Sequence, residues 1–110
     1  MLPESEKLVL SLRERTSAAT AELNEAEKRF GENNDQRLKD HIHQARHWLN
    51  DIESHFIRRL HDLPPERTPA DEVRVLAEAN VHLDTYALPA VGKIVEWSKT
   101  FGSRFKTIGL

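Results

Sequence analysis

Apolar residues recur at steps of three or four positions from Leu38 to Leu63, with no Gly or Pro between them. The positions are Leu38, Ile42, Ala45, Leu49, Ile52, Phe56, Leu60 (or the Arg59 slot) and Leu63. A period close to 3.5 residues is typical of a helix with a narrow apolar seam, which neighbouring helices must cover. The seam therefore predicts a long helix that packs against other helices, from the same chain or from a partner.

Helix-start and helix-stop signals predict three long helices joined by short connections. The expected ranges are 4–30, 35–62 and 69–101, followed by a tail over 102–110. Pro3 suits the first position of the first helix and Gly31 suits its C-terminal cap, whereas Pro64 and Pro65 end the second helix. We expect an all-α fold, an antiparallel up-down bundle with coiled-coil-like packing, in a single domain over residues 1–110.

Capping signals mark the starts of the second and third helices. The segment Thr68-Pro69-Ala70-Asp71 combines a capping residue, a proline at the first helical position and an acid in the capping-box slot. It is the strongest local signal in the chain. Asn33, with Gln36 three residues later, or Asn34 alone is expected to cap the second helix.

Pro89 lies inside the third predicted helix. An interior proline costs about 3 kcal/mol or more in a regular helix. The segment is therefore either a helix kinked at 87–89 or two shorter helices, which would make a four-helix bundle. The apolar pattern keeps its phase through Pro89, and this continuity favours the kinked helix.

The inward stripes of the first and third helices are less regular than the seam. For the first helix we predict Leu8, Leu12, Arg15 or Thr16, Ala19, Leu23, Ala26 and Phe30. For the third we predict Val73, Leu76, Ala77, Asn80, Leu83, Ala87, Ala90 or Val91, Ile94, Trp97 or Ser98, and Phe101. Four apolar residues fall off these stripes and widen the apolar surface: Val9, Leu10, Val75 and Val95.

With 110 residues, a net charge of −2 and no cysteine, the chain is expected to form one domain without disulfides or thiolate zinc sites. Its acidic start is not typical of a secretory signal peptide. No window approaches the roughly 18 apolar residues of a membrane span. A cytoplasmic location is expected. In composition alone, the chain resembles small helical bacterial or phage proteins.

Five of the six histidines lie on the second predicted helix, and they suggest a metal site. His43 and His47 are four residues apart and Asp51 continues their row, a spacing that can chelate a transition metal. The heptad register places this row opposite Leu49 and Ile52, on an exposed face. Without a ligand from another helix the row remains a weak candidate, and we expect a solvated polar face with no metal.

Catalytic motifs are absent from the sequence. It has no Gly-rich phosphate loop, nucleophile elbow or zincin motif. Pairs such as Asp51 with His55, or Glu78 with His82, have the spacing of ordinary surface pairs on a helix. We expect no enzymatic activity, no catalytic residue and no cofactor.

Trp48, Ile57 and Leu60 lie beside the seam and widen its apolar face. Exposed apolar width of this kind often marks a protein interface. Phe30, Phe56 and Phe101 are expected in the core instead, and Trp97 at the end of the bundle. The sequence thus predicts a small interaction module that forms a homo-oligomer or binds a larger protein through the flank of its second helix.

Nucleic-acid binding is the alternative function, through the basic C-terminal end. Its candidate residues are Arg58, Arg59, Lys99, Arg104 and Lys106. Aromatic residues interleave with these lysines in the C-terminal segment, as in a basic amphipathic helix. Four basic residues over 93–106 are few for a phosphate-binding surface, so this alternative ranks below a protein partner.

Overall fold

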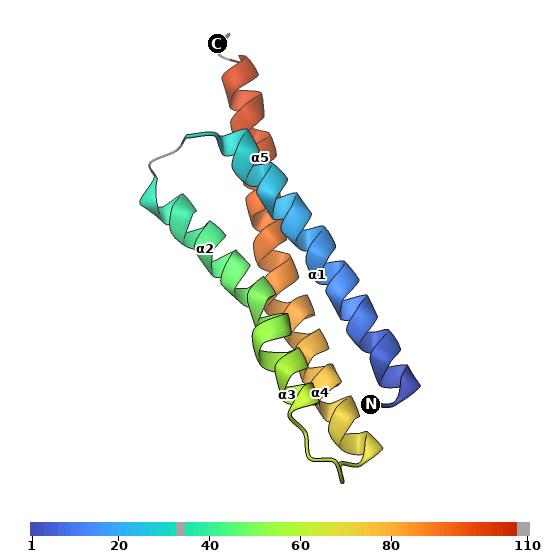
Figure 1. The fold of residues 1–110 in the computed structure, drawn as a ribbon. Helices are drawn as coiled ribbons and strands as arrows, with labels where there is room; N and C mark the ends of the chain where they lie inside the picture. The colour runs from blue at the N-terminus through green and yellow to red at the C-terminus, as the bar shows by residue number, and fades with distance from the viewer. Residues whose placement is uncertain (33–34, 108–110) are drawn as a thin grey trace.

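A computed structural model describes residues 1–32 and 35–107, with side chains up to Thr100. Three helical segments pack side by side and run up, down and up (Figure 1). The first is α1 (Pro3–Phe30). The second joins α2 (Gln36–Asp51), the π turn η1 (Ile52–Ile57) and α3 (Arg58–His61), and the third joins α4 (Pro69–His82), the π turn η2 (Leu83–Ala87) and α5 (Leu88–Thr107). The predicted all-α bundle is confirmed.

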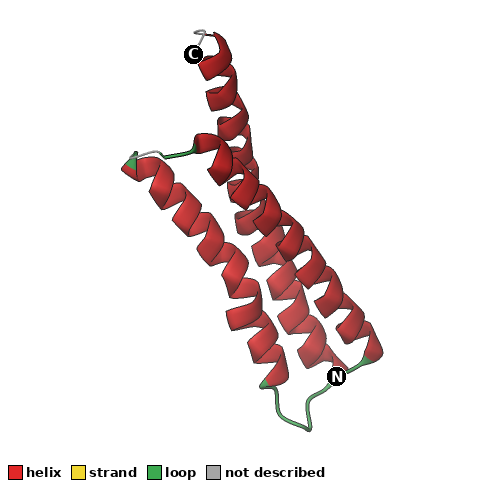
Figure 2. Cartoon of the chain, turned by 45° about the horizontal axis from the view of Figure 1, so that its top comes forward, coloured by secondary structure: helices red, strands yellow, loops and turns green. Residues whose placement is uncertain are grey.

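The bundle is elongated, with principal extents of 64 × 23 × 17 Å. Both views show α5 projecting beyond the ends of α1 and α2 (Figures 1 and 2). The predicted end at Phe101 is wrong, because residues 102–107 continue the helix instead of starting a tail. Among the residues described, no helix combines the length and the apolar character that a membrane crossing needs.

Local signals set the helix ends largely as predicted. Gly31 has a φ of 63°, a conformation that favours glycine, and its N–H donates to the carbonyls of Glu27 and Lys28. At the start of α4 the carboxylate of Asp71 accepts the N–H of Thr68 at 3.0 Å, which lowers the pKa of Asp71 and completes the capping box.

The cap of α2 differs from the prediction. The carboxylate of Asp35 accepts the N–H of Arg37 at 2.9 Å, so Asp35 is the capping residue. Asn33 and Asn34, the predicted caps, lie outside the described residues.

The π turn η1 shifts the seam of the second segment by one residue. The N–H of Arg58 bonds the carbonyl of Glu53, five residues back, so the turn here holds more residues than a turn of an α-helix. The residue five places after Ile52 therefore returns to the core face. Ile57 is 1% exposed and Leu60 is fully buried, whereas Phe56 is half-buried. The prediction that Ile57 and Leu60 form an outer interface is wrong.

The chain remains helical through Pro89, so the predicted alternative of two separate helices is wrong. The turn before the proline is wide: the N–H of Leu88 bonds the carbonyl of Leu83, five residues back. A proline has no N–H to donate, and its ring clashes with the carbonyl four residues back in a regular helix. The wide turn η2 is the distortion that accompanies Pro89.

The buried residues in the first turns of α1 and α4 also differ from the predicted inward stripes. Val9 and Val75 are buried, whereas Leu8 is 49% exposed and Val73 lies on the surface. The register of α1 holds steps of three and four back to Ser5, which is buried although polar. The hydropathy pattern could not show that α1 begins its inward stripe at Ser5, because serine is polar.

Glu72, a buried acid on α4, forms hydrogen bonds with two other parts of the chain at the end of the bundle where α1 starts. Its carboxylate accepts hydrogen bonds from Nε of Arg67 at 2.7 Å and from the N–H of Leu2 at 3.1 Å. Together with a hydrogen bond from the hydroxyl of Ser5, these contacts lower the pKa of Glu72 to about 2. The start of α1, the loop before α4 and α4 itself meet at this carboxylate.

The burial of the leucines predicts which of them stabilise the bundle. Leu60→Ala removes a fully buried side chain and is expected to lower the free energy of unfolding by about 2–5 kcal/mol. Leu10→Ala is the matched control, because Leu10 is 58% exposed and the same change there should cost within about 0.5 kcal/mol. Urea unfolding followed by circular dichroism measures both. Equal costs would contradict the placement of Leu60 in the core.

The contacts of Glu72 predict a pH dependence of stability. The folded-state pKa of about 2 lies below the ordinary value of 4.5, so the stabilisation is present above pH 4.5 and is lost as the pH falls towards 2. Glu72→Gln should therefore lower the urea midpoint at pH 7, while the gap between variant and wild type should shrink near pH 2. A gap of the same size at both pH values would show that the ionised carboxylate does not stabilise the fold.

Candidate interaction site

The weak metal candidates His43, His47 and Asp51 are not all brought together in the structure. His47 Nε2 lies 3.7 Å from Oδ2 of Asp51, but the same oxygen also faces Nε2 of His82 on α4 at 3.8 Å. His43 is exposed and has no part in this arrangement. Within the described part of the chain, no group of three or more histidine, cysteine or acidic side chains is placed to hold a metal ion.

His82 connects the two π turns. Its Nε2 lies 3.1 Å from the carbonyl oxygen of Trp48, and since a carbonyl can only accept, Nε2 carries the proton. In a regular helix that carbonyl would accept the N–H of Ile52. At the start of η1 the Ile52 N–H instead bonds the carbonyl of Leu49, and the ring of His82 donates to Trp48. A side chain from α4 thus supplies a donor to a carbonyl at the distorted end of α2.

Aromatic rings surround His82. Its ring centroid lies 5.1 Å from that of Phe56 in η1 and 5.7 Å from that of Tyr86 in η2. The rings of Tyr86 and Trp48 are 5.8 Å apart. These distances lie within the range of favourable ring contacts. The cluster runs from the half-buried Phe56 to Tyr86, which is 50% exposed on the surface.

The surface end of this cluster opens into a groove of about 300 Å³ between α2 and the η2–α5 segment, which we call the aromatic groove. One end is formed by Trp48 and Tyr86. The other is formed by His41 and Trp97, whose rings meet edge to face with centroids 5.1 Å apart. The remaining lining residues are Gln44, Thr85, Pro89, Ala90, Lys93 and Ile94. Trp97, expected to pack at the bundle end, is 41% exposed on the rim.

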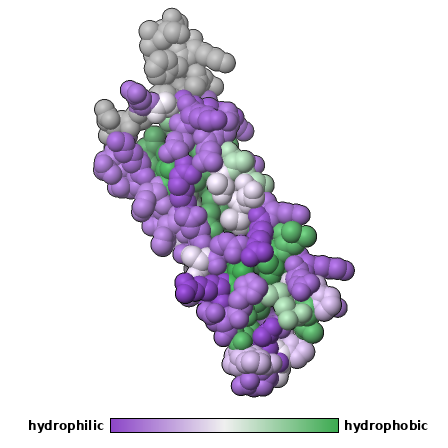
Figure 3. Space-filling model, in the orientation of Figure 1, coloured by the Kyte–Doolittle hydropathy of each residue, from purple (hydrophilic) through white to green (hydrophobic). Residues whose placement is uncertain are grey.

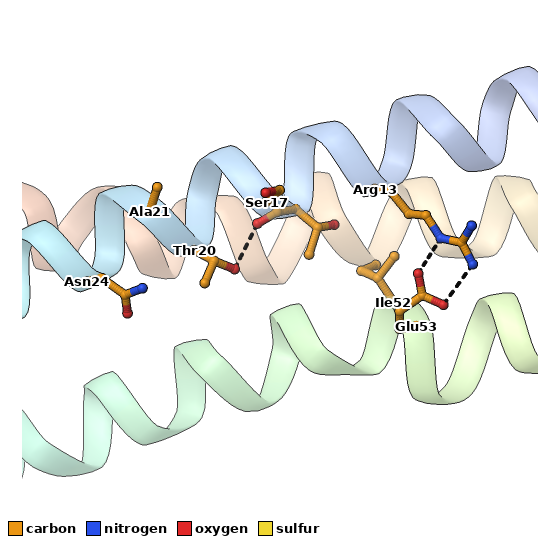
Figure 4. A pocket seen from close by; sticks show the side chains of 8 residues that line it. Arg13, Ser17, Thr20, Ala21, Asn24, Ile52 and Glu53 are labelled. Carbon is orange, nitrogen blue, oxygen red and sulfur yellow. Dashed lines mark hydrogen bonds and ion pairs between the residues drawn. The ribbon is translucent and has the colours of Figure 1, made fainter.

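A second groove, of about 560 Å³, lies between α1 and the second segment (Figure 4). Its α1 wall consists of short side chains such as Ser17, Thr20 and Ala21. The ion pair of Arg13 and Glu53 crosses one end, and the Thr20 hydroxyl donates to a carbonyl of its own helix. On this face, hydrophobic residues follow the middle of the molecule between hydrophilic flanks (Figure 3). The groove lacks aromatic residues, so its chemistry is less suited to anchoring a partner.

Of the predicted nucleic-acid residues, the three whose side chains the structure describes do not gather in one patch. Arg58 and Arg59 lie in α3, at the opposite end of the bundle from Lys99 in α5 (Figure 1). Arg59 donates to Glu78 on α4 at 2.7 Å, so its charge is already paired. The side chains of Arg104 and Lys106 lie outside the described residues.

Of the predicted interface residues, only Trp48 lies at the candidate site. Ile57 and Leu60 are in the core. Nothing in the hydropathy pattern predicts that Tyr86, Trp97 and His41 lie beside Trp48. Their grouping depends on contacts between helices that are far apart along the chain. One weak signal was available in the sequence: Tyr86 and Trp97, on either side of Pro89, are eleven residues apart, which is close to three helical turns.

The chain matches no protein-family model, no curated protein and no solved structure. Its function therefore has to be inferred from the geometry and chemistry of its own surface.

The contact between His82 and Trp48 predicts a cost for losing the ring nitrogen. His82→Phe keeps an aromatic ring against Phe56 and Tyr86 but leaves the Trp48 carbonyl without its donor. The free energy of unfolding should fall by about 1–3 kcal/mol. His43→Phe is the control, because His43 is exposed and should tolerate the change. Denaturant unfolding that ranks the two variants equally would refute a role for this hydrogen bond.

Proposed function

We propose that this chain is a small non-enzymatic interaction module that binds a protein partner through the aromatic groove. The observation that carries the proposal is the arrangement of His41, Trp48, Tyr86 and Trp97 as two ring pairs around one groove. Tryptophan and tyrosine are the residues that most often anchor protein interfaces, because each buries a large area at a small cost in side-chain entropy.

The exposure of the rings supports this role over a purely structural one. Tyr86 and Trp97 keep roughly half of their surface in solvent, although Ala87, Val91 and Ile94 on the same helical segment are buried in the core. A partner that covers these rings would remove a sizeable apolar area from water. The partner is either a second copy of the chain or a different protein. The molecular mass of the purified chain in solution distinguishes the two, because self-association raises it.

Binding at the aromatic groove predicts that a double variant, Tyr86→Ser with Trp97→Ser, loses the partner while keeping the fold. Aromatic anchors typically contribute about 2 kcal/mol or more each. Affinity capture from extracts of the native cells measures binding to a different protein. Light scattering of the purified chain measures self-association. The matched control is Val73→Ser with Val81→Ser, which removes exposed apolar residues from α4 and leaves the groove intact.

Two results would contradict the proposal. In the first, wild type and the groove variant capture the same proteins to the same extent. In the second, wild type captures nothing and remains monomeric at high micromolar concentration.

A further inference from the structure

We infer that His82 is a positioning residue of the aromatic groove, one that fixes Trp48 and Tyr86 in the arrangement that receives the partner. His82 does not line the groove, and its side chain is only 15% exposed. It therefore acts through the two aromatic residues and not by touching the partner. The inference rests on the proposed function and concerns how one end of that site is held in place.

The two ends of the groove differ in the backbone that carries them. His41 and Trp97 lie within the α-helices α2 and α5, whose regular hydrogen bonds fix the direction of each side chain. At the other end, Tyr86 lies inside the π turn η2, and Trp48 lies in the last turn of α2, directly before η1. Because a π turn departs from the regular hydrogen-bond ladder, this end needs a restraint from another part of the chain.

His82 supplies a restraint to both residues at this end. Its Nε2 donates to the carbonyl oxygen of Trp48 at 3.1 Å, and its ring centroid lies 5.7 Å from that of Tyr86. Oδ2 of Asp51 is 3.8 Å from the same nitrogen, too far for a hydrogen bond, so the carbonyl is the acceptor. Phe56 contacts the imidazole as well, with centroids 5.1 Å apart. One side chain thus joins the backbone at Trp48 to the ring of Tyr86.

Rings that are fixed before binding give a higher affinity than rings that move. An exposed aromatic side chain that is mobile in the free protein loses entropy when a partner immobilises it, and this loss opposes binding. Tyr86 is 50% exposed, and its contact with Trp48, at 5.8 Å between centroids, lies at the surface. The contacts of His82 hold both residues from behind. Loss of His82 should therefore weaken binding although it does not line the groove.

The first test measures the environment of Trp48 in the folded full chain without denaturant. The chain contains two tryptophans, so Trp97→Phe leaves Trp48 as the single fluorophore. In that background, His82→Leu should shift the emission maximum of Trp48 to longer wavelength and increase its quenching by acrylamide. His82→Gln retains an N–H donor and should restore most of the wild-type signal. His43→Leu is the matched control, because His43 is exposed and should leave both signals unchanged.

The second test measures binding in the chain that retains both tryptophans. His82→Leu should weaken affinity capture of the partner about tenfold, and His82→Gln should weaken it less. Val9→Ala separates this effect from a general loss of stability. It removes buried methyl groups from α1, a helix that contributes no residue to the groove, and should capture like wild type. All variants are compared at a temperature at which circular dichroism shows that they are folded.

Two outcomes would overturn the inference. One is a Trp48 signal that His82→Leu leaves unchanged; if this variant does not fold, His82→Phe, which also lacks the donor, replaces it. The other is capture that Tyr86→Ser with Trp97→Ser abolishes but His82→Leu does not affect, in which case the proposed function holds. A wild type that captures nothing and remains monomeric contradicts the proposed function instead, and the fluorescence of Trp48 still decides whether His82 positions it.

Discussion

The hydrogen bond from His82 to the carbonyl of Trp48 joins the two distorted turns of the bundle. It connects the last residue of α4, directly before η2, to the last turn of α2, directly before η1. A π turn weakens the regular ladder of helical hydrogen bonds, so it persists where other contacts compensate. Here the ring of His82 supplies a donor on one side and packs against Phe56 and Tyr86 on the other.

Paired arginines fix how the three segments align around this contact. Arg13 pairs with Glu53 and Arg46 with Glu27, both between α1 and the second segment. Arg15 pairs with Asp84, between α1 and η2. A fourth pair, Arg59 with Glu78, joins α3 to α4. Exposed ion pairs contribute only about 0–1 kcal/mol each. Their effect is therefore mainly on register: they favour one sliding position of the helices over its neighbours, and the buried apolar residues provide the stability.

Local signals in the sequence were sufficient for the helices but not for the π turns. Gly31 and the Thr68–Asp71 capping box act through neighbouring residues, so their effects can be predicted without the fold. Phe56 and Ile57 are adjacent and both apolar, so the hydropathy pattern fits a step of four or of five after Ile52 equally well. Only the neighbouring helices select between them. The site was less predictable still, because its ring pairs join residues that are 38 and 56 positions apart.

The wide turns link the core of this protein to its proposed working surface. The turn η1 brings Ile57, predicted on the outer flank, into the core beside Leu60, and Trp48 is the predicted flank residue that lines the groove. The turn η2 accommodates Pro89 and carries Tyr86, so that both line the same groove as Trp48. In a regular helix the residues that follow η2, Pro89 and Trp97 among them, would be rotated by about 100° per residue relative to those before it. The π turns thus affect both parts of the molecule: η1 brings Ile57 into the core, and η2 carries Tyr86 at the groove.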